Sequence, residues 1–306
     1  MGAYFLRKLL QSLLLILGVL VLVFMMVRFT GDPVALMVSR EATAEQREQI
    51  RVSLGLDQPV PVQFVRYLGG LLRGDLGQSL SLGLPNSLLI GQRIGATFEL
   101  ALASLLLSLA IAVPLGIMAG LRPGSGMDWL GRSVGLAGQT IHSVWLAMIL
   151  ILVFAVQLRW LPSFGRDSWQ SLILPTLALS LGSIGQIVQL TRSTVLEVRR
   201  ENFIRTAHAK GMSGQRVAFG HIAPNVAIPL ISVISVGFTY ALGGSVYIEQ
   251  VFAWPGLGSL LSNAIGDNDF PLVQSITIFI ALFAISVNLI TDLLYGVVDP
   301  RVRLGR

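Results

Sequence analysis

The chain has 306 residues, of which 53% are hydrophobic and only 12% charged, and its mean hydropathy is +0.73. Soluble domains carry about 25% charged residues because their surfaces meet water, so this composition excludes an ordinary soluble protein and indicates a surface in lipid. The formal net charge is +6, but the basic residues are spread over loops between apolar runs, which favours a topology signal over nucleic-acid binding. The absence of cysteine excludes disulfides and thiolate metal sites.

The first apolar run covers residues 9–27 and follows Arg7 and Lys8. A secretory signal has an apolar region of about 7–15 residues and then a small-residue cleavage site. This run is longer and continues into Arg28–Pro33 without such a site. It therefore predicts a retained first transmembrane span, within residues 1–30, and a cytoplasmic N-terminus.

Residues 31–95 differ in kind, because six arginines and six acidic residues balance to zero. Thr43–Gln46 fits a capping box that opens a helix, and Gly55 is expected to close that helix. A second helix is predicted to start at Pro59 and Pro61 and to end at Gly74. We interpret 31–95 as a small, mostly helical domain outside the membrane.

Five further apolar runs each come close to or exceed the roughly 20 residues that a helix needs to cross a bilayer. They are Thr97–Leu121, Ser133–Leu158, Leu172–Leu190, Val226–Ile248 and Leu272–Val298. The prediction is an all-α polytopic membrane protein with six transmembrane helices, in which 96–298 forms the five-helix core and 299–306 a cytoplasmic tail. The short loops carry more Lys and Arg on the side of the N-terminus, which places both termini inside.

Glycines recur four residues apart at Gly116 and Gly120 and at Gly131 and Gly135. Small residues at this spacing let membrane helices approach closely. Because the chain has 32 glycines, chance pairs are also expected, so both interpretations stay open.

The segment 192–225 is a second stretch that a bilayer could not hold. Between Arg192 and Arg216 it carries six basic residues against two acids. A small basic helix between two spans either contacts lipid headgroups or is bound by another protein. The segment lacks the long apolar face of a membrane-surface helix, which disfavours the first alternative.

Signatures of enzymatic chemistry are weak in this chain. Its two lysines, Lys8 and Lys210, do not follow a phosphate-binding glycine-rich loop. Its three histidines, at 142, 208 and 221, show no zinc-like spacing. We therefore expect no enzyme.

Polar side chains inside predicted spans are costly in lipid and tend to line a cavity. In the third and fourth spans such residues predict a translocation path, with structural hydrogen bonding as the alternative: Gln139, His142, Gln186 and Gln189. For Asn288 and Asp292, one turn apart in the last span, an interhelical hydrogen bond is the preferred interpretation. Glu99, at the mouth of the second span, fits a place in the membrane interface.

The stretch Asn202–Gly211, with Pro224 after it, resembles the cytoplasmic motif of binding-protein-dependent ABC importer permeases. Ala207, Gly211 and Pro224 match the general motif, whereas Arg205 and Thr206 stand where it has Glu and Ala, which is similar to the dipeptide/oligopeptide/nickel branch. Four further stretches agree with that branch, so the resemblance covers nearly the whole chain: Thr30–Pro33, Leu54–Pro59, Phe252–Gly258 and Asp292–Arg301.

The resemblance implies a permease subunit of an ATP-driven importer in the bacterial cytoplasmic membrane, forming half of a pathway for short peptides. Nickel or a metal chelate is the alternative cargo. The implied partners are a second homologous permease, two ATPase subunits that hold ATP and Mg, and a solute-binding protein, with no cofactor on this chain. A stand-alone secondary transporter is the rival from another class, but it calls for intramembrane carboxylates, which are nearly absent here. A purely structural membrane subunit would leave the cytoplasmic motif unexplained.

By this resemblance the basic helix is a coupling helix that docks in a groove of an ATPase. The residues expected to carry the coupling are Phe203, Ile204, Arg205, Thr206, Ala207, Lys210, Gly211 and Pro224. Arg205 and Lys210 would offer charge, and Phe203, Ile204 and Ala207 would offer packing.

Two residues are expected to shape that segment. Gly211 would end the helix in a left-handed conformation, and Pro224 would block helix continuation and fix the angle into the fifth span. The resemblance also implies that Trp254, Pro255 and Gly256 form a short re-entrant element near the outer gate. His142 stands where many relatives carry proline. Because imidazole is a ligand for nickel, this histidine leaves a metal or metal-chelate substrate as an alternative.

Overall fold

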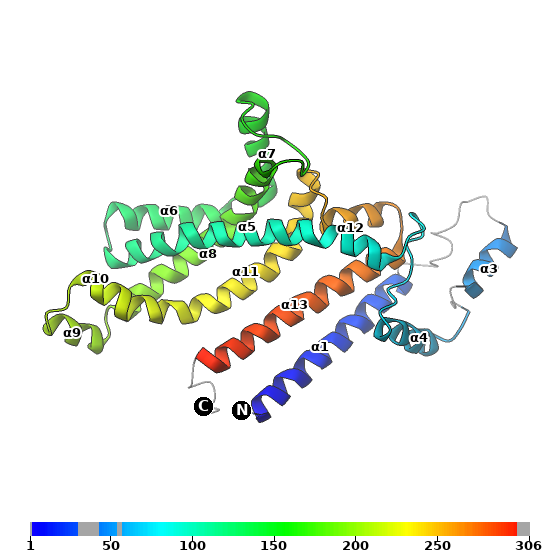
Figure 1. Ribbon diagram of the computed structural model, residues 1–306, viewed down its shortest axis with the longest axis horizontal. Coiled ribbons are helices and arrows are strands. Elements are labelled where there is room, and N and C mark those ends of the chain that lie inside the picture. The colour runs from blue at the N-terminus through cyan, green and yellow to red at the C-terminus, as the bar shows by residue number, and fades with distance from the viewer. Residues whose placement is uncertain (1, 30–42, 54–56, 299–306) are drawn as a thin grey trace. The chain divides into compact units, whose positions relative to one another are not determined.

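The computed structural model describes residues 2–29, 43–53 and 57–298 (Figure 1). Regular structure in these ranges is helical, apart from a single antiparallel bridge between Gln78 and Pro85. By internal contacts the chain divides into two compact units, one of Thr97–Trp254 with Val287–Arg306 and one of Gly2–Ala96 with Pro255–Ser286.

The helices cover most of the predicted spans. In chain order they are α1 Gly2–Phe29, α3 Ala44–Ser53, α4 Val60–Leu72, α5 Asn86–Leu121, α6 Gly126–Thr140, α7 Ser143–Leu150, the π-helix η1 Ile151–Gln157, the 3-10 helix η2 Trp169–Leu172, α8 Ile173–Val198, α9 Asn202–Ala209, α10 Gly214–Val217, the π-helix η3 Ala218–Ile222, α11 Ala223–Val251, α12 Leu257–Gly266 and α13 Phe270–Val298. Among the described residues, five helices are long and apolar enough to cross a membrane, or six if one bent pair counts as a single span. The all-α polytopic class is therefore confirmed.

The third predicted span differs from a simple crossing. The run Ser133–Leu158 falls on two helices, Gly126–Thr140 and Ser143–Gln157, that meet at an angle of 102°. Ile141 and His142 are both extended, with ψ of 119° and 134°, and two extended residues in succession interrupt the helical hydrogen bonds. The hydrophobicity of the run predicts that it lies in lipid, but it does not predict where the helix breaks.

The larger unit is built around α8, which packs against α6, α7 and α11. Glycines on α5 make a close approach to α8 possible: a Cβ added to Gly116 would lie 2.6 Å from Cβ of Thr191, and one added to Gly120 would lie 2.6 Å from Cβ of Val195. No side chain fits at such distances, so the spacing of small residues reflects specific helix packing and not chance.

The contact between α6 and α8 is tighter still. A Cβ on Gly138 would lie 2.5 Å from the carbonyl oxygen of Leu181 and 2.8 Å from Cα of Gly185. The two backbones thus touch at Gly138 and Gly185, which the sequence analysis did not single out.

In the other unit, the helix after the first loop packs on the first span. Phe24 of α1 lies edge-on to Phe64 of α4 at 5.1 Å between ring centroids and 5.7 Å from Tyr67. Ile278 of α13 joins the same hydrophobic cluster. The helices predicted within 31–95 are present as α3 and α4, although Gly55 lies outside the described residues, and α5 begins at Asn86 and not at Thr97. Whether 31–95 is a domain outside the membrane remains a prediction.

A polar network fixes the turn before α5 to the start of α13 in this unit. Asp269 is 1% exposed and accepts hydrogen bonds from the hydroxyls of Ser79 at 2.5 Å and Ser81 at 2.9 Å. It also caps α13 by accepting from the backbone N–H of Leu272 at 3.2 Å. Asn86 donates to the carbonyl oxygen of Leu76 and to the hydroxyl of Ser275. These bonds satisfy buried polar groups that would otherwise destabilise the fold.

Candidate functional site

The basic segment forms a short helix, α9, that follows α8 after the turn at 199–201 (Figure 1). Its end is a glycine C-cap: Gly211 has φ +77°, and the N–H of Met212 donates to the carbonyl oxygen of Ala207 at 3.2 Å. This hydrogen bond, from the N–H of one residue to the carbonyl oxygen five residues earlier, is typical of a Schellman motif. Glycine is favoured at the left-handed position because it has no Cβ. The expectation that Gly211 ends the helix in this conformation is confirmed.

The two faces of α9 have different surroundings. Ile204 and Ala207, three residues apart, are 3% and 5% exposed and belong to one hydrophobic cluster with Val217, Ile222 and residues of α5, α8 and α11. Their apolar surface is already covered by this chain, so the expectation that they offer packing to a partner is wrong. Their part is to fasten α9 to the spans.

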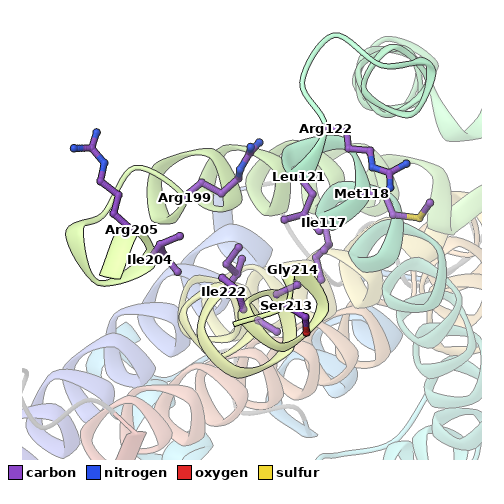
Figure 2. A pocket seen from close by; sticks show the side chains of 13 residues that line it. Ile117, Met118, Leu121, Arg122, Arg199, Ile204, Arg205, Ser213, Gly214 and Ile222 are labelled. Carbon is purple, nitrogen blue, oxygen red and sulfur yellow. The ribbon is translucent and has the colours of Figure 1, made fainter. Parts of the chain in front are cut away.

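The open face of α9 carries the remaining residues of the motif. Phe203 is 43% exposed and lies 6.4 Å, between ring centroids, from the imidazole of His221. Arg205, Thr206 and Lys210 are exposed as well. Figure 2 shows Arg205 directed away from α10 while Ile204 faces it. An aromatic ring beside two cations is therefore available on the open face.

Pro224 has a different local role from the one expected. It lies in the first turn of α11, which continues directly from α10 and η3, so the expectation that it blocks helix continuation is wrong. Proline has no N–H and crowds the preceding turn. The π-helix Ala218–Ile222 is wider, and the N–H of Ala223 donates to the carbonyl oxygen of Ala218, five residues back. We infer that this wider turn accommodates the proline.

Two arginines that the sequence analysis counted as loop charges are tied to other helices. Arg192 is paired with Asp128, which is nearly buried and also accepts from the N–H of Gly124 at 2.8 Å. Arg132 lies 3.4 Å from the same carboxylate. Arg199 donates to the carbonyl oxygen of Gly120 at 3.0 Å. These contacts fix the start of α6 and the end of α5 to α8. In the sequence, the one feature that could have predicted them is Asp128, an acidic residue in a short basic loop.

The residues expected to line a path are on exposed surface of this single chain. Gln139 follows the Gly138 contact on α6, and Gln186 follows its counterpart Gly185 on α8; both side chains are exposed. Gln189 is exposed too, and its Cγ lies 2.8 Å from where a Cβ of Gly135 would stand, so this side chain also packs on α6. His142 caps α7, where its Nδ1 accepts from the N–H of Val144 at 3.3 Å.

The preference for an interhelical bond at the end of the last span is confirmed for Asn288. Its Oδ1 lies 3.4 Å from the hydroxyl of Ser235 on α11, and Thr291 donates to that hydroxyl at 2.8 Å. The side chain of Asp292 lies outside the described residues.

Away from α9, charged and aromatic contacts connect other parts of the larger unit. Glu99 pairs with Arg166, whose guanidinium lies 5.8 Å from the ring centroid of Trp254. Trp254 is 1% exposed, and buried Glu249 accepts from the hydroxyl of Thr97 at 2.8 Å. Glu99 thus has a defined partner in addition to its expected place at the mouth of a span. Pro255 and Gly256 begin the other unit, where Gly256 caps the short helix α12.

Family models match nearly the whole chain. Residues 112–304 match the "Binding-protein-dependent transport system inner membrane component", and residues 1–85 match the N-terminal region of such membrane components. The fold is similar to that of the MetNI methionine ABC transporter in inward-facing conformations, with a TM-score of 0.57 at 17% sequence identity, over 70% of this chain and 97% of that one.

Curated relatives match over their full length. A probable peptide ABC transporter permease protein, y4tP, of Sinorhizobium fredii is 36% identical over 99% of this chain and 100% of the relative. The oligopeptide transport system permease protein AppB of Bacillus subtilis is 35% identical over 99% of both chains. The glutathione transport system permease protein GsiC of Pectobacterium atrosepticum is 36% identical over 98% of both. With its apolar helices and its short fastened helix α9, this chain belongs to the binding-protein-dependent family of inner-membrane transport components: it is a multi-pass permease of the cytoplasmic membrane that works with a separate ATPase and a binding protein.

Proposed function

We propose that this chain forms half of the translocation pathway of an ATP-driven importer of short peptides. A second, homologous permease would supply the other half, two ATPase subunits would bind the cytoplasmic side, and a solute-binding protein would deliver peptide from outside. The observation that carries the proposal is that α9 has two different faces: one is buried against the spans and the other is open. The helix ends in a glycine C-cap at Gly211.

In this mechanism the open face of α9 is the ATPase contact. Phe203 offers a ring for a partner groove, and Arg205 and Lys210 offer charge. Ile204 and Ala207 pass any displacement of α9 to α8 and α11, because their side chains share one cluster with both helices. Closure of the two ATPases on ATP would then tilt the spans and change which side of the membrane the pathway faces.

The pathway itself is assigned to the exposed polar side chains near the junction of α6 and α8, Gln139, His142, Gln186 and Gln189. They are polar groups at membrane depth that are exposed in the single chain, which favours a second permease or a solvated passage beside them. The outer gate is assigned to Trp254, Pro255 and Gly256, and the contact of Arg166 with Trp254 supports a rigid element there.

Peptides are the proposed cargo because the relatives quoted above carry the names of peptide, oligopeptide and glutathione systems. Nickel or a metal chelate remains the alternative, for which His142 is the one sequence feature named above; the described residues contain no group of three or more His, Asp or Glu side chains that could hold a metal ion. Choice between peptides rests mainly on the binding protein.

The proposal is tested by replacing Gly211 with valine in the complete transporter. Valine at a φ of +77° is strained by about 1–3 kcal/mol, although a Cβ there meets nothing within 4 Å. We expect peptide uptake to be lost while the protein stays in the membrane. Normal uptake by Gly211→Val, or uptake that persists when the companion ATPases are deleted, would rule out the coupling assignment and favour a stand-alone transporter.

Two matched variants separate strain from bulk. Gly211→Asn keeps a residue that tolerates the left-handed region, so partial uptake is expected. Gly220→Val adds the same side chain to an open position without positive φ, and near-normal uptake is expected.

A further inference from the structure

A cavity of about 790 Å³ lies between the end of α5, the turn after α8, α9 and the α10–η3 segment (Figure 2). Its size falls within the range of about 300–1,000 Å³ that is usual for small-molecule sites. All of its lining residues belong to the larger unit. On the side of α9 it is lined by buried Ile204 and by exposed Arg205, so it reaches from the covered face of this helix to the edge of its open face.

The lining of this cavity has two chemically distinct parts. Its apolar part comes from Ile117 and Leu121 of α5, together with the buried side chains of Ile204, Val217 and Ile222. Its cationic part comes from Arg122 and Arg199, whereas Arg205 lines the cavity with its side chain directed away from α10 (Figure 2). An occupant that satisfies both parts must carry an anionic group next to an apolar chain.

The arginines have donors to offer such an anion. A guanidinium has five N–H donors, and Arg199 uses one of them on the carbonyl oxygen of Gly120. Arg122 is exposed at the end of α5. Planar guanidinium groups bind phosphate through paired, charge-assisted hydrogen bonds, so a phosphate group suits this part of the cavity.

The place of the cavity on the molecule decides the kind of occupant. Ile117, Met118 and Leu121 belong to the last turns of α5, a helix that is long and apolar enough to cross the membrane, and Met118 is 46% exposed. The cavity therefore adjoins the end of a membrane-spanning helix and also carries cations, and a phospholipid offers both an acyl chain and a charged headgroup at such a place.

We propose that this cavity binds an anionic phospholipid of the inner leaflet, with the phosphate beside Arg122 and Arg199 and an acyl chain on the apolar lining. Basic pockets beside transmembrane helices on the cytoplasmic side suit such headgroups. The proposal rests on the proposed function only in assigning this end of the molecule to the cytoplasmic side. A bound lipid would fill the space behind α9 and so support the helix against force applied to its open face.

The test uses the complete transporter in phosphatidylcholine vesicles that contain a small fraction of phosphatidylglycerol with a photoactivatable acyl chain. Labelling is mapped by mass spectrometry of peptides from 117–122 and 213–223. We expect labelling of both peptides, competition by unlabelled phosphatidylglycerol and no competition by glycerol phosphate. An otherwise identical phosphatidylcholine probe should label these peptides weakly.

Arg122→Gln is the main variant, because its side chain is exposed and its replacement leaves the fold intact. Each cation near an anionic surface contributes a factor of about five to binding, so labelling should fall about fivefold. Arg199→Gln should act in the same direction. Arg200→Gln is the matched control: this arginine is the next residue, is exposed and does not line the cavity, so labelling should be unchanged.

Three outcomes would overturn the proposal. Equal labelling by the two lipid probes would mean that the arginines do not select a headgroup, and competition by glycerol phosphate would make the ligand a free phosphate ester. Loss of labelling only when the ATPases are bound would make the cavity part of the protein interface. In each case the effect of Gly211→Val on uptake would stand, so the proposed function is judged separately.

Discussion

Neighbouring residues of α9 face opposite surroundings, and this makes their roles separable by single substitutions. Ile204→Ala removes a side chain that is 97% buried among the spans, at a cost of about 2–5 kcal/mol. We expect a lower melting temperature of the purified permease. Phe203→Ala removes a side chain that is 43% exposed, so the melting temperature should stay near that of the wild type while less ATPase copurifies. If Phe203→Ala lowered stability and left ATPase binding intact, the open face would not be the docking face.

Asp269 allows a pH-dependent test of the polar network that joins the turn before α5 to the start of α13. Burial acts to raise the pKa of this carboxyl, but hydrogen bonds from the hydroxyl of Ser79 and from the backbone and hydroxyl of Ser81 outweigh it and hold the pKa below its usual value. A lowered folded pKa contributes stability above the unfolded pKa of about 3.9 and loses it as the pH falls through the folded pKa.

The expected result concerns the difference in melting temperature between wild type and Asp269→Asn. The variant should be less stable at pH 7, by about 1–3 kcal/mol, and the difference should shrink as the pH falls below the unfolded pKa and through the lower folded pKa, where the native carboxyl takes up a proton. Asp267→Asn, two residues earlier and exposed, should show neither effect. A difference that is constant from pH 7 to pH 3 would mean that the charge of Asp269 does not hold this turn.

At the scale of single residues, the sequence predicted local backbone geometry well and tertiary surroundings poorly. Gly211 was assigned its left-handed cap because the requirement is local to one turn. The faces of α9 were not separated, since an eight-residue helix with isoleucine, alanine and phenylalanine has no pattern that tells a covered apolar residue from an exposed one. The pairing of Arg192 with Asp128 joins residues 64 positions apart, and no spacing rule reports such a contact.

At the scale of elements, the contact of α6 with α8 depends on glycine more strictly than the predicted pairs do. Gly138→Ala would place a Cβ 2.5 Å from a backbone oxygen, so the helices must separate, at a cost of about 1–3 kcal/mol. Gly182→Ala is the matched control on the facing helix, because its Cβ would make an ordinary contact at 3.7 Å. Thermal unfolding of both variants in the same detergent should show a loss of stability for Gly138→Ala alone. Equal stability of the two variants would mean that this contact is looser than described.

Element boundaries were predictable where hydropathy or a cap defines them, and not where the backbone is irregular. The runs that became α1, α8 and α13 are long and apolar, and lipid requires such runs. The break at Ile141 and His142 and the π-helix before Pro224 arise from backbone conformations that hydropathy does not encode. Because of the π-helix, Pro224 does not end the helix as expected. A proline in the sequence disfavours a regular α-helix, but the sequence does not reveal that a wider turn can accommodate it.

At the scale of the whole molecule, the orientation in the membrane is a direct prediction of the charge bias. The chain has no cysteine, so single cysteines can be introduced without background. A cysteine at Lys210→Cys should react with a membrane-impermeant maleimide only in opened cells, and one at Asp167→Cys should react in intact cells. Both positions are exposed. Reaction of Lys210→Cys in intact cells would place α9 outside and remove the basis for a cytoplasmic ATPase contact.

The hydrophobic cluster that holds α9 has a consequence for the efficiency of the transporter. Ile204 and Ala207 pack with residues of α5, α8 and α11, so the short helix and the long ones shift as one body while that packing is intact. Under the coupling proposed above, a cluster loosened by heat or by a smaller side chain would let α9 shift by itself, and nucleotide would then be hydrolysed without solute accumulating. The ratio of ATP hydrolysed to solute imported would then depend on how well a few apolar side chains pack against α9.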